Sequence, residues 1–166
     1  MLTYELMLKS LGALLLFASA GVWTLKSKRQ GSERLRRLRG QIAFVAFVRE
    51  RIERYLLPIS QIIEECDKKI AEDIVIGCDD IEYFDIEGLR TVLRAGRYYS
   101  DGGAEFDRFL SALGSSYRED EIAGCDACIK ELTGLYDKLS SEMPKEEKSR
   151  AVLAFCFAAA IVIILI

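Results

Sequence analysis

The sequence predicts an all-α protein: a cytoplasmic bundle of long antiparallel helices with shorter helices between them, flanked by N- and C-terminal transmembrane helices. Two observations predict this fold. In the middle of the chain, apolar residues recur at alternating steps of three and four, which is the period of a helix. Apolar runs stand at both ends of the 166 residues, and no long segment alternates polar and apolar residues as a strand would.

The chain ends in "AVLAFCFAAAIVIILI", Ala151 to Ile166, which has no polar side. As a helix it would be roughly 24 Å long, somewhat shorter than a hydrocarbon core of about 30 Å. Lys148 and Arg150 can lengthen the span, because their stems lie along lipid while their charges reach the interface. We therefore expect a basic flank and a second transmembrane helix over 145–166. The alternative is a helix buried in the core of a partner protein.

The first apolar segment, residues 6–25, is long enough to span a bilayer. It also resembles a signal peptide, because "ASA" offers small residues for cleavage after Ala20. Apolar residues continue through Leu25, however, and a dense positive run follows them, which resists translocation. We expect an uncleaved anchor over 6–25.

Basic residues flank both spans on the side of the middle segment, which predicts the orientation. Residues 26–39 contain seven basic residues and one acid, Lys26, Lys28, Arg29, Glu33, Arg34, Arg36, Arg37 and Arg39. Cytoplasmic flanks carry the excess of Lys and Arg, so the central domain should be cytoplasmic and both termini extracytoplasmic. The basic segment 26–40 should face anionic lipid. It lacks the interleaved aromatic residues of a nucleic-acid interface, so no nucleic-acid partner is expected.

The expected cytoplasmic domain, residues 41–144, begins within a helical stripe. Its members are Leu35, Leu38, Ile42, Val45, Ile52, Leu56, Ile59, Ile63, Cys66 and Ile70. Pro58 should kink or break this helix, because proline removes a helical hydrogen bond. The following "IVIGCDDIEYFD" predicts a loop or a short extended piece.

Three further segments complete the expected domain. A short helix begins near Ile86 and ends near Gly96, and "SDGG" marks a loop. A second short helix should end at Gly114 as a left-handed cap. The last and clearest helical stripe contains Ile122, Cys125, Ile129, Leu132, Tyr136, Leu139 and Met143. Pro144 should kink that last helix.

The central domain is acidic. Residues 41–144 contain 12 Lys and Arg against 22 Asp and Glu, so their net charge is 12 − 22 = −10. This charge has two interpretations: simple solubility, or an electrostatic docking surface for a basic partner.

Residue types that carry chemistry are scarce in this chain. It contains no histidine, the commonest general base and metal ligand. The carboxylate pairs Glu64/Glu65 and Asp79/Asp80 lie in polar runs, and "SDGGAEF" lacks the Lys-Ser/Thr of a phosphate-binding loop. We therefore expect no enzyme, no cofactor, and no catalytic, cofactor-binding or metal residues.

Cysteine offers the alternative function, a metal or redox sensor anchored to the membrane. Cys125 and Cys128 would share a helix face and could ligate zinc together, but a tetrahedral site needs two more ligands. Only Cys66 and Cys78 could supply them, since Cys156 lies in the expected span. The competing interpretation is small buried side chains in a reducing compartment.

The order of these segments resembles the stage III sporulation protein AB family of endospore-forming bacteria. The resemblance rests on "RLRRLRGQI", "RIERYLLPI", "EFDRFLSALGSSYREDEI" with Phe109 and Leu113–Gly114, and the terminal apolar helix. Tyr117 stands where an acid is common in the family, and Glu121 where glutamine is common. Pro144 interrupts a helix that is continuous in relatives, and residues 74–103 do not align.

The resemblance implies a helical domain similar to those of type II secretion inner-membrane platform proteins. It also implies a place in the channel complex that links mother cell and forespore, in the mother-cell membrane facing the forespore. The implied partners are the lipid bilayer, a cytoplasmic ATPase encoded alongside, and other membrane proteins of the same assembly. The implied role is a non-enzymatic platform or adaptor.

Overall fold

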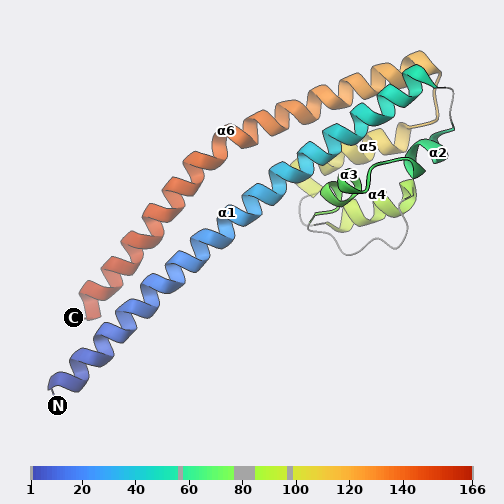
Figure 1. The fold of residues 1–166 in the computed structure, drawn as a ribbon. Coiled ribbons are helices and arrows are strands. Elements are labelled where there is room, and N and C mark those ends of the chain that lie inside the picture. Colours follow the sequence, from blue (N-terminus) through green and yellow to red (C-terminus); the bar gives the residue numbers. More distant parts are fainter. Residues whose placement is uncertain (1, 56–57, 77–84, 97–98, 166) are drawn as a thin grey trace. The chain divides into compact units, whose positions relative to one another are not determined.

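Helices account for most of the described chain, and no strand occurs within it. A computed structural model describes residues 2–55, 58–76, 85–96 and 99–165. The elements follow one another as α1 (Leu2–Arg54), α2 (Ile59–Glu64), α3 (Lys68–Ile74), α4 (Ile86–Ala95), η1 (Tyr99–Gly103), α5 (Ala104–Ala112) and α6 (Arg118–Leu165). The expected all-α class, with two long helices and shorter ones between, is confirmed (Figure 1).

The chain divides into two compact units, and both long helices contribute to each. Met1–Ser32 with Ser141–Ile166 form one, called here the terminal unit, and Glu33–Ser140 form the other, called the helical domain. The basic segment expected at 26–40 is thus divided, with residues 33–40 in the helical domain. There, Arg34 pairs with Asp101 at 2.7 Å and Arg36 pairs with Asp73 at 2.6 Å.

Within the helical domain, α1 and α6 run antiparallel, as expected. Arg49 donates to Asp126 at 2.6 Å, and Arg39 donates to Tyr136 at 2.7 Å. From the first contact to the second, the position moves ten residues toward the N-terminus in α1 and ten residues toward the C-terminus in α6, as antiparallel helices require. Figure 1 shows α2, α3, α4 and α5 gathered beside this helix pair.

The expected stripe from Leu35 to Ile70 is broken twice rather than once. The first break is at Pro58, which stands before α2 in an extended conformation, as expected. The second break was not predicted: α2 ends at Glu64, and Asp67 begins α3 by accepting a hydrogen bond from the Lys69 amide at 2.8 Å. An aspartate at this position satisfies an amide that has no partner within the helix, which favours starting a new helix there.

The next segments agree with the sequence in part. Ile74, expected in a loop or extended piece, is instead the buried last residue of α3, while residues 77–84 of that piece lie outside the described part. The predicted helix from Ile86 to about Gly96 is confirmed as α4. The "SDGG" loop is the centre of η1, where Asp101 and Gly102 have non-helical dihedral angles.

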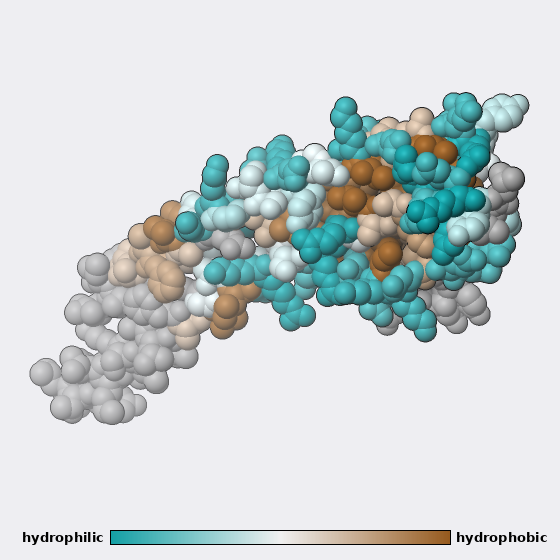
Figure 2. Space-filling view, turned by 45° about the horizontal axis from the view of Figure 1, so that its top comes forward, coloured by the Kyte–Doolittle hydropathy of each residue, from teal (hydrophilic) through white to brown (hydrophobic). Residues whose placement is uncertain are grey.

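One hydrophobic core holds the helical domain together. Its buried members are Leu38, Phe44, Val45, Val48, Ile62, Ile63, Ile74, Leu89, Leu93, Phe106, Phe109, Leu110, Cys125, Cys128 and Leu132. At its centre the Phe44 and Phe106 rings meet edge to face, with centroids 5.6 Å apart. Hydrophilic residues cover much of the face that Figure 2 shows, with hydrophobic ones visible between them.

The terminal unit contains the N-terminal part of α1 and the C-terminal part of α6. Arg150 donates to the Ser27 hydroxyl at 3.4 Å and pairs with Glu146 at 3.0 Å. α6 continues through Pro144 without a break. Large apolar side chains are exposed on both helices, namely Val22, Trp23, Leu25, Val152, Leu153, Phe155, Phe157 and Ile161.

The transmembrane helices expected at 6–25 and 145–166 are not supported by the structure. Within the described part of the chain, no helix is both long enough and apolar enough to cross a membrane. The side chains of 6–11, 13–17 and 20, and those of 147, 158 and 162–166, lie outside that description.

Candidate functional site

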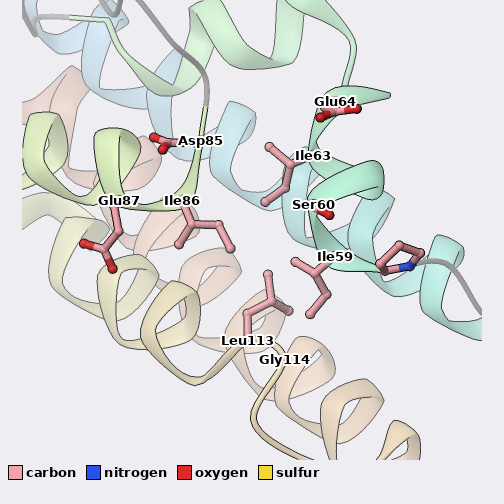
Figure 3. Close-up of a pocket in the computed structure, with 10 residues that line it drawn as sticks. Ile59, Ser60, Ile63, Glu64, Asp85, Ile86, Glu87, Leu113 and Gly114 are labelled. Atoms are coloured by element: carbon pink, nitrogen blue, oxygen red, sulfur yellow. The ribbon is translucent and has the colours of Figure 1, made fainter.

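A pocket of about 650 Å³ opens on the helical domain where three segments meet. α2 with Pro58 forms one side, the start of α4 forms another, and the turn after α5 forms the third. Figure 3 shows the side chains of Ile59, Ile63, Ile86 and Leu113 converging on the space between these segments. Its volume falls in the range of ordinary ligand pockets.

The floor of this pocket is apolar because each segment presents an isoleucine or leucine that also packs on the core. Ile63 is buried, and Ile59, Ile86 and Leu113 are half-buried against the core cluster. Pro58 places Ile59 in the first turn of α2, where the Gln61 amide bonds back to the Pro58 carbonyl at 3.0 Å. Proline suits this position, because its fixed φ and missing N–H do no harm at a helix start.

Every charged residue that lines this pocket, among those the structure describes, is acidic. They are Glu64, Asp85 and Glu87, all of them exposed, and Figure 3 shows them around the apolar floor. Asp85 caps α4 by accepting a hydrogen bond from the Gly88 amide at 2.7 Å. Glu87 pairs with Arg90 at 2.9 Å, whereas Glu64 has no ion pair among the described residues. The rim is therefore a local site of negative potential beside apolar surface.

The turn between α5 and α6 is fixed by Gly114 and Glu121. Gly114 has a φ of 86°, the left-handed conformation expected of it as a cap. A Cβ atom there would lie 2.8 Å from Cδ1 of Ile59, so the turn packs closely on α2, and the positive φ would strain any other residue. The Glu121 carboxylate accepts hydrogen bonds from the amides of Gly114 and Ser116, at 2.8 and 3.1 Å.

A second pocket of about 420 Å³ adjoins the first and shares Pro58, Ile59 and Gly114 with it. Arg118 lines this second pocket, and its guanidinium donates to the backbone carbonyls of Ile52 and Glu53 at the end of α1. Arginine stabilises a helix end there, since those carbonyls have no partner within the helix. The neighbouring Tyr117 is 86% exposed, and Tyr55, which lines the second pocket, is also exposed.

An ionic cluster fastens α4 to α5 within the same domain. Buried Asp107 accepts hydrogen bonds from Arg90 at 3.0 Å, from Arg94 at 2.9 Å, and from the Tyr99 hydroxyl at 3.4 Å. Burial by itself would raise the pKa of Asp107, but the hydrogen bonds from the two arginines outweigh it and hold that pKa below its usual value. Because α4 carries Ile86 and Glu87, this cluster helps to position one wall of the pocket.

The cysteines that the structure describes are not grouped into a metal site. Cys125 and Cys128 are buried in the core, where burial raises the pKa of Cys125 to about 11 and that of Cys128 to about 12. Half-buried Cys66 has a pKa raised to about 11, again mainly by burial. Thiols with such pKa values stay protonated near neutral pH and are poor nucleophiles and ligands.

The other candidate residues are likewise dispersed. Cys156 is exposed in the terminal unit, and Cys78 lies outside the described residues, as do Asp79 and Asp80. Of the first carboxylate pair, Glu64 lines the pocket while Glu65 pairs with Arg51 at 3.4 Å. Across the described ranges, no three His, Cys, Asp or Glu side chains are grouped closely enough to hold a metal ion.

The sequence did not reveal the pocket itself. The spacing of apolar residues places Ile59 and Ile86 in helices but does not show that they meet. Asp85 and Glu87 contribute only to the overall negative charge of the domain. The available signal was the "LG" of Leu113–Gly114, which marks a turn without showing what packs against it. Comparison with known proteins adds no relative: no family model matches the chain, nor does any curated protein or solved structure.

Proposed function

We propose that the protein is a non-enzymatic, membrane-anchored platform that docks a cytoplasmic ATPase. The observation that carries this proposal is the apolar pocket whose charged lining residues, Glu64, Asp85 and Glu87, are all acidic. An apolar floor supplies affinity by burial, and a one-signed rim supplies steering and selects a basic partner. This arrangement favours the docking interpretation of the acidic domain over simple solubility.

Two features of the terminal unit support membrane anchoring. Bulky apolar side chains such as Trp23 and Phe157 are exposed there, and exposed apolar patches of this kind mark contact with lipid or protein. The contact between Ser27 and Arg150 brings together the points where the two apolar segments meet their basic flanks. We therefore keep 6–25 and 145–166 as proposed spans, with the helical domain cytoplasmic and both termini extracytoplasmic.

The assembly follows from the resemblance to the stage III sporulation protein AB family. On this proposal the chain resides in the mother-cell membrane that faces the forespore, as part of the channel complex between the two cells. Its partners are the bilayer, the ATPase encoded alongside, and other membrane proteins of the channel. The proposal includes no nucleic acid and no cofactor. Leu113–Gly114, one of the elements on which the resemblance rests, lines the pocket, which supports the choice of this pocket as the proposed docking site.

The proposal assigns no reaction to the chain. The sequence has no histidine, and the thiols of Cys66, Cys125 and Cys128 are held protonated by burial. These pKa values also argue against the alternative of a cysteine-based metal or redox sensor. The work in the complex would then come from the docked ATPase.

Affinity capture of the tagged chain from sporulating cells tests the proposed assembly. We expect the ATPase and other channel proteins to co-purify, and we expect them to be absent from a capture with an unrelated tagged membrane protein. If neither the ATPase nor the other channel proteins co-purify with the tagged chain, the platform role is contradicted. Reporter fusions at each end test the anchoring separately, because a cytoplasmic C-terminus would contradict the proposed hairpin topology.

A further inference from the structure

We propose that the two adjoining pockets together receive one amphipathic helix of the partner, with two apolar side chains on one face and lysine or arginine at one end. This inference rests on the proposed function and specifies how the docking would occur. It names the chemistry of the bound segment and the residues that would contact it. The groove formed by the two pockets is called here the docking groove.

The shape of the docking groove indicates two anchor positions. Its two pockets, of about 650 and 420 Å³, share the lining residues Pro58, Ile59 and Gly114. Partner helices bind grooves through side chains one turn apart, since residues i, i+3 and i+4 lie on one face. One anchor would contact Ile86 and Leu113 in the first pocket, and the next would contact Ile52 and Tyr55 in the second.

The charges of the docking groove indicate which end of the helix is basic. Of the described residues that line the first pocket, three are acidic and none is basic. In the second pocket, Glu121 bonds to the amides of the turn and Arg118 bonds to the carbonyls of α1, so both charges already have partners within the domain. In the first pocket, Glu87 pairs with Arg90, whereas Glu64 has no ion pair among the described residues. The basic end of the partner helix should therefore lie over the first pocket, beside Glu64.

A second copy of this chain is a poorer occupant than another protein. The chain's own basic segment also contains leucines, but three of its arginines are engaged inside the helical domain. Arg34 pairs with Asp101, Arg36 with Asp73, and Arg39 with Tyr136. Leu38 of the same segment is buried in the core. Releasing this segment would disrupt the domain that forms the groove.

A defined probe tests the groove without the ATPase. The probe is a fluorescent synthetic peptide with leucines one helical turn apart and lysines at one end, titrated into the purified full-length chain. We expect saturable binding, and we expect peptides with alanine for leucine or glutamate for lysine to bind far less. Ser60→Trp places a bulky side chain at an exposed position of the first pocket and should weaken binding at least about tenfold.

Matched variants control for folding and for net charge. Ala127→Trp adds the same side chain at an exposed position outside both pockets and should leave binding unchanged. Glu64→Lys should weaken binding of the basic peptide, whereas Glu72→Lys makes the same charge change outside the pockets and should have a smaller effect. No peptide binding, or equal binding by the Ser60→Trp and Ala127→Trp variants, would overturn the inference. Self-association of the chain that Ser60→Trp abolishes would show a second copy to be the occupant.

The same variants separate this inference from the proposed function. If the ATPase binds the unchanged chain and the Ser60→Trp chain equally, the platform role stands and the docking groove is wrong. If the ATPase does not bind the unchanged chain while the peptide binds in the groove, the proposed partner is wrong and the groove's chemistry stands. If the Ser60→Trp variant loses ATPase binding while the unchanged chain and the Ala127→Trp variant keep it, the result supports both the platform role and the docking groove.

Discussion

The guanidinium of Arg94 donates two hydrogen bonds to a single carboxylate oxygen of Asp107, at 3.0 and 2.9 Å. Arg90 donates to the other oxygen at 3.0 Å, so one buried carboxylate joins two turns of α4 to α5. This joint fastens α4, which carries Ile86 and Glu87 of the pocket, to α5.

Replacing Asp107 with Asn should destabilise the helical domain by about 1–3 kcal/mol, because a buried charge-assisted network loses its anion. Urea unfolding followed by circular dichroism measures the change. Asp126→Asn is the matched control, since Asp126 also pairs with an arginine, Arg49, but is exposed. We expect the control to lose less stability. If both variants lost the same free energy of unfolding, the buried Asp107 cluster would stabilise the domain no more than an exposed ion pair does.

The same cluster predicts a dependence on pH. The folded pKa of Asp107 lies below its unfolded value, so the unfolded state binds a proton more readily. The stabilisation is therefore complete above the ordinary aspartate pKa of about 4 and is lost as pH falls through the lower folded pKa. The stability difference between the unchanged chain and Asp107→Asn should narrow between neutral pH and pH about 3. A difference that stays constant or widens on acidification contradicts this assignment.

Gly40 should not tolerate a larger residue. A Cβ atom at this position in α1 would lie 2.8 Å from Cβ of Asp73 and 3.0 Å from its backbone carbon, so α3 would have to move. We expect Gly40→Ala to destabilise by about 1–3 kcal/mol. Gly134→Ala is the control: nothing lies within 4 Å of its added Cβ, and the change should stabilise α6 by about 0.5–1 kcal/mol. Thermal unfolding measures both changes in stability. If both variants were stabilised, or both destabilised, the predicted difference between the two glycines would be wrong.

Cys125 and Cys128 should be unreactive until the chain unfolds. Their pKa values of about 11 and 12 and their burial leave little thiolate to react at neutral pH. Site-resolved mass spectrometry after iodoacetamide treatment should find both labelled only in denaturant. Replacing both with Ala should leave the fold intact, with a packing loss of about 1–2 kcal/mol. Stoichiometric bound zinc, or rapid labelling of the native chain, would favour the sensor interpretation instead.

Periodicity predicted the long helices well because their buried faces repeat within one element. The stripe from Ile122 to Met143 belongs to α6, and Cys125 and Leu132 on it are core residues. The same method missed the break at Asp67, because Ile63, Cys66 and Ile70 keep helical spacing across it. A capping side chain decided that boundary, and an apolar stripe carries no information about capping.

The candidate site was beyond prediction for a different reason. Its parts come from residues 58–64, 85–87 and 113–114, and nothing in their spacing shows that the three segments meet. Their meeting depends on long-range contacts, such as that of Gly114 with Ile59. The sequence did predict an acidic domain, but the location of its apolar surface required the fold.

The most direct test of the platform role is the equilibrium binding of the purified full-length chain to the ATPase at two salt concentrations. Exposed charges are screened over about 10 Å at 0.1 M salt and about 3 Å at 1 M salt. The account predicts measurable binding at the lower concentration and weaker binding at the higher one, since the acidic rim contributes while the apolar floor remains. Absence of binding at both concentrations, with both proteins folded, would contradict it.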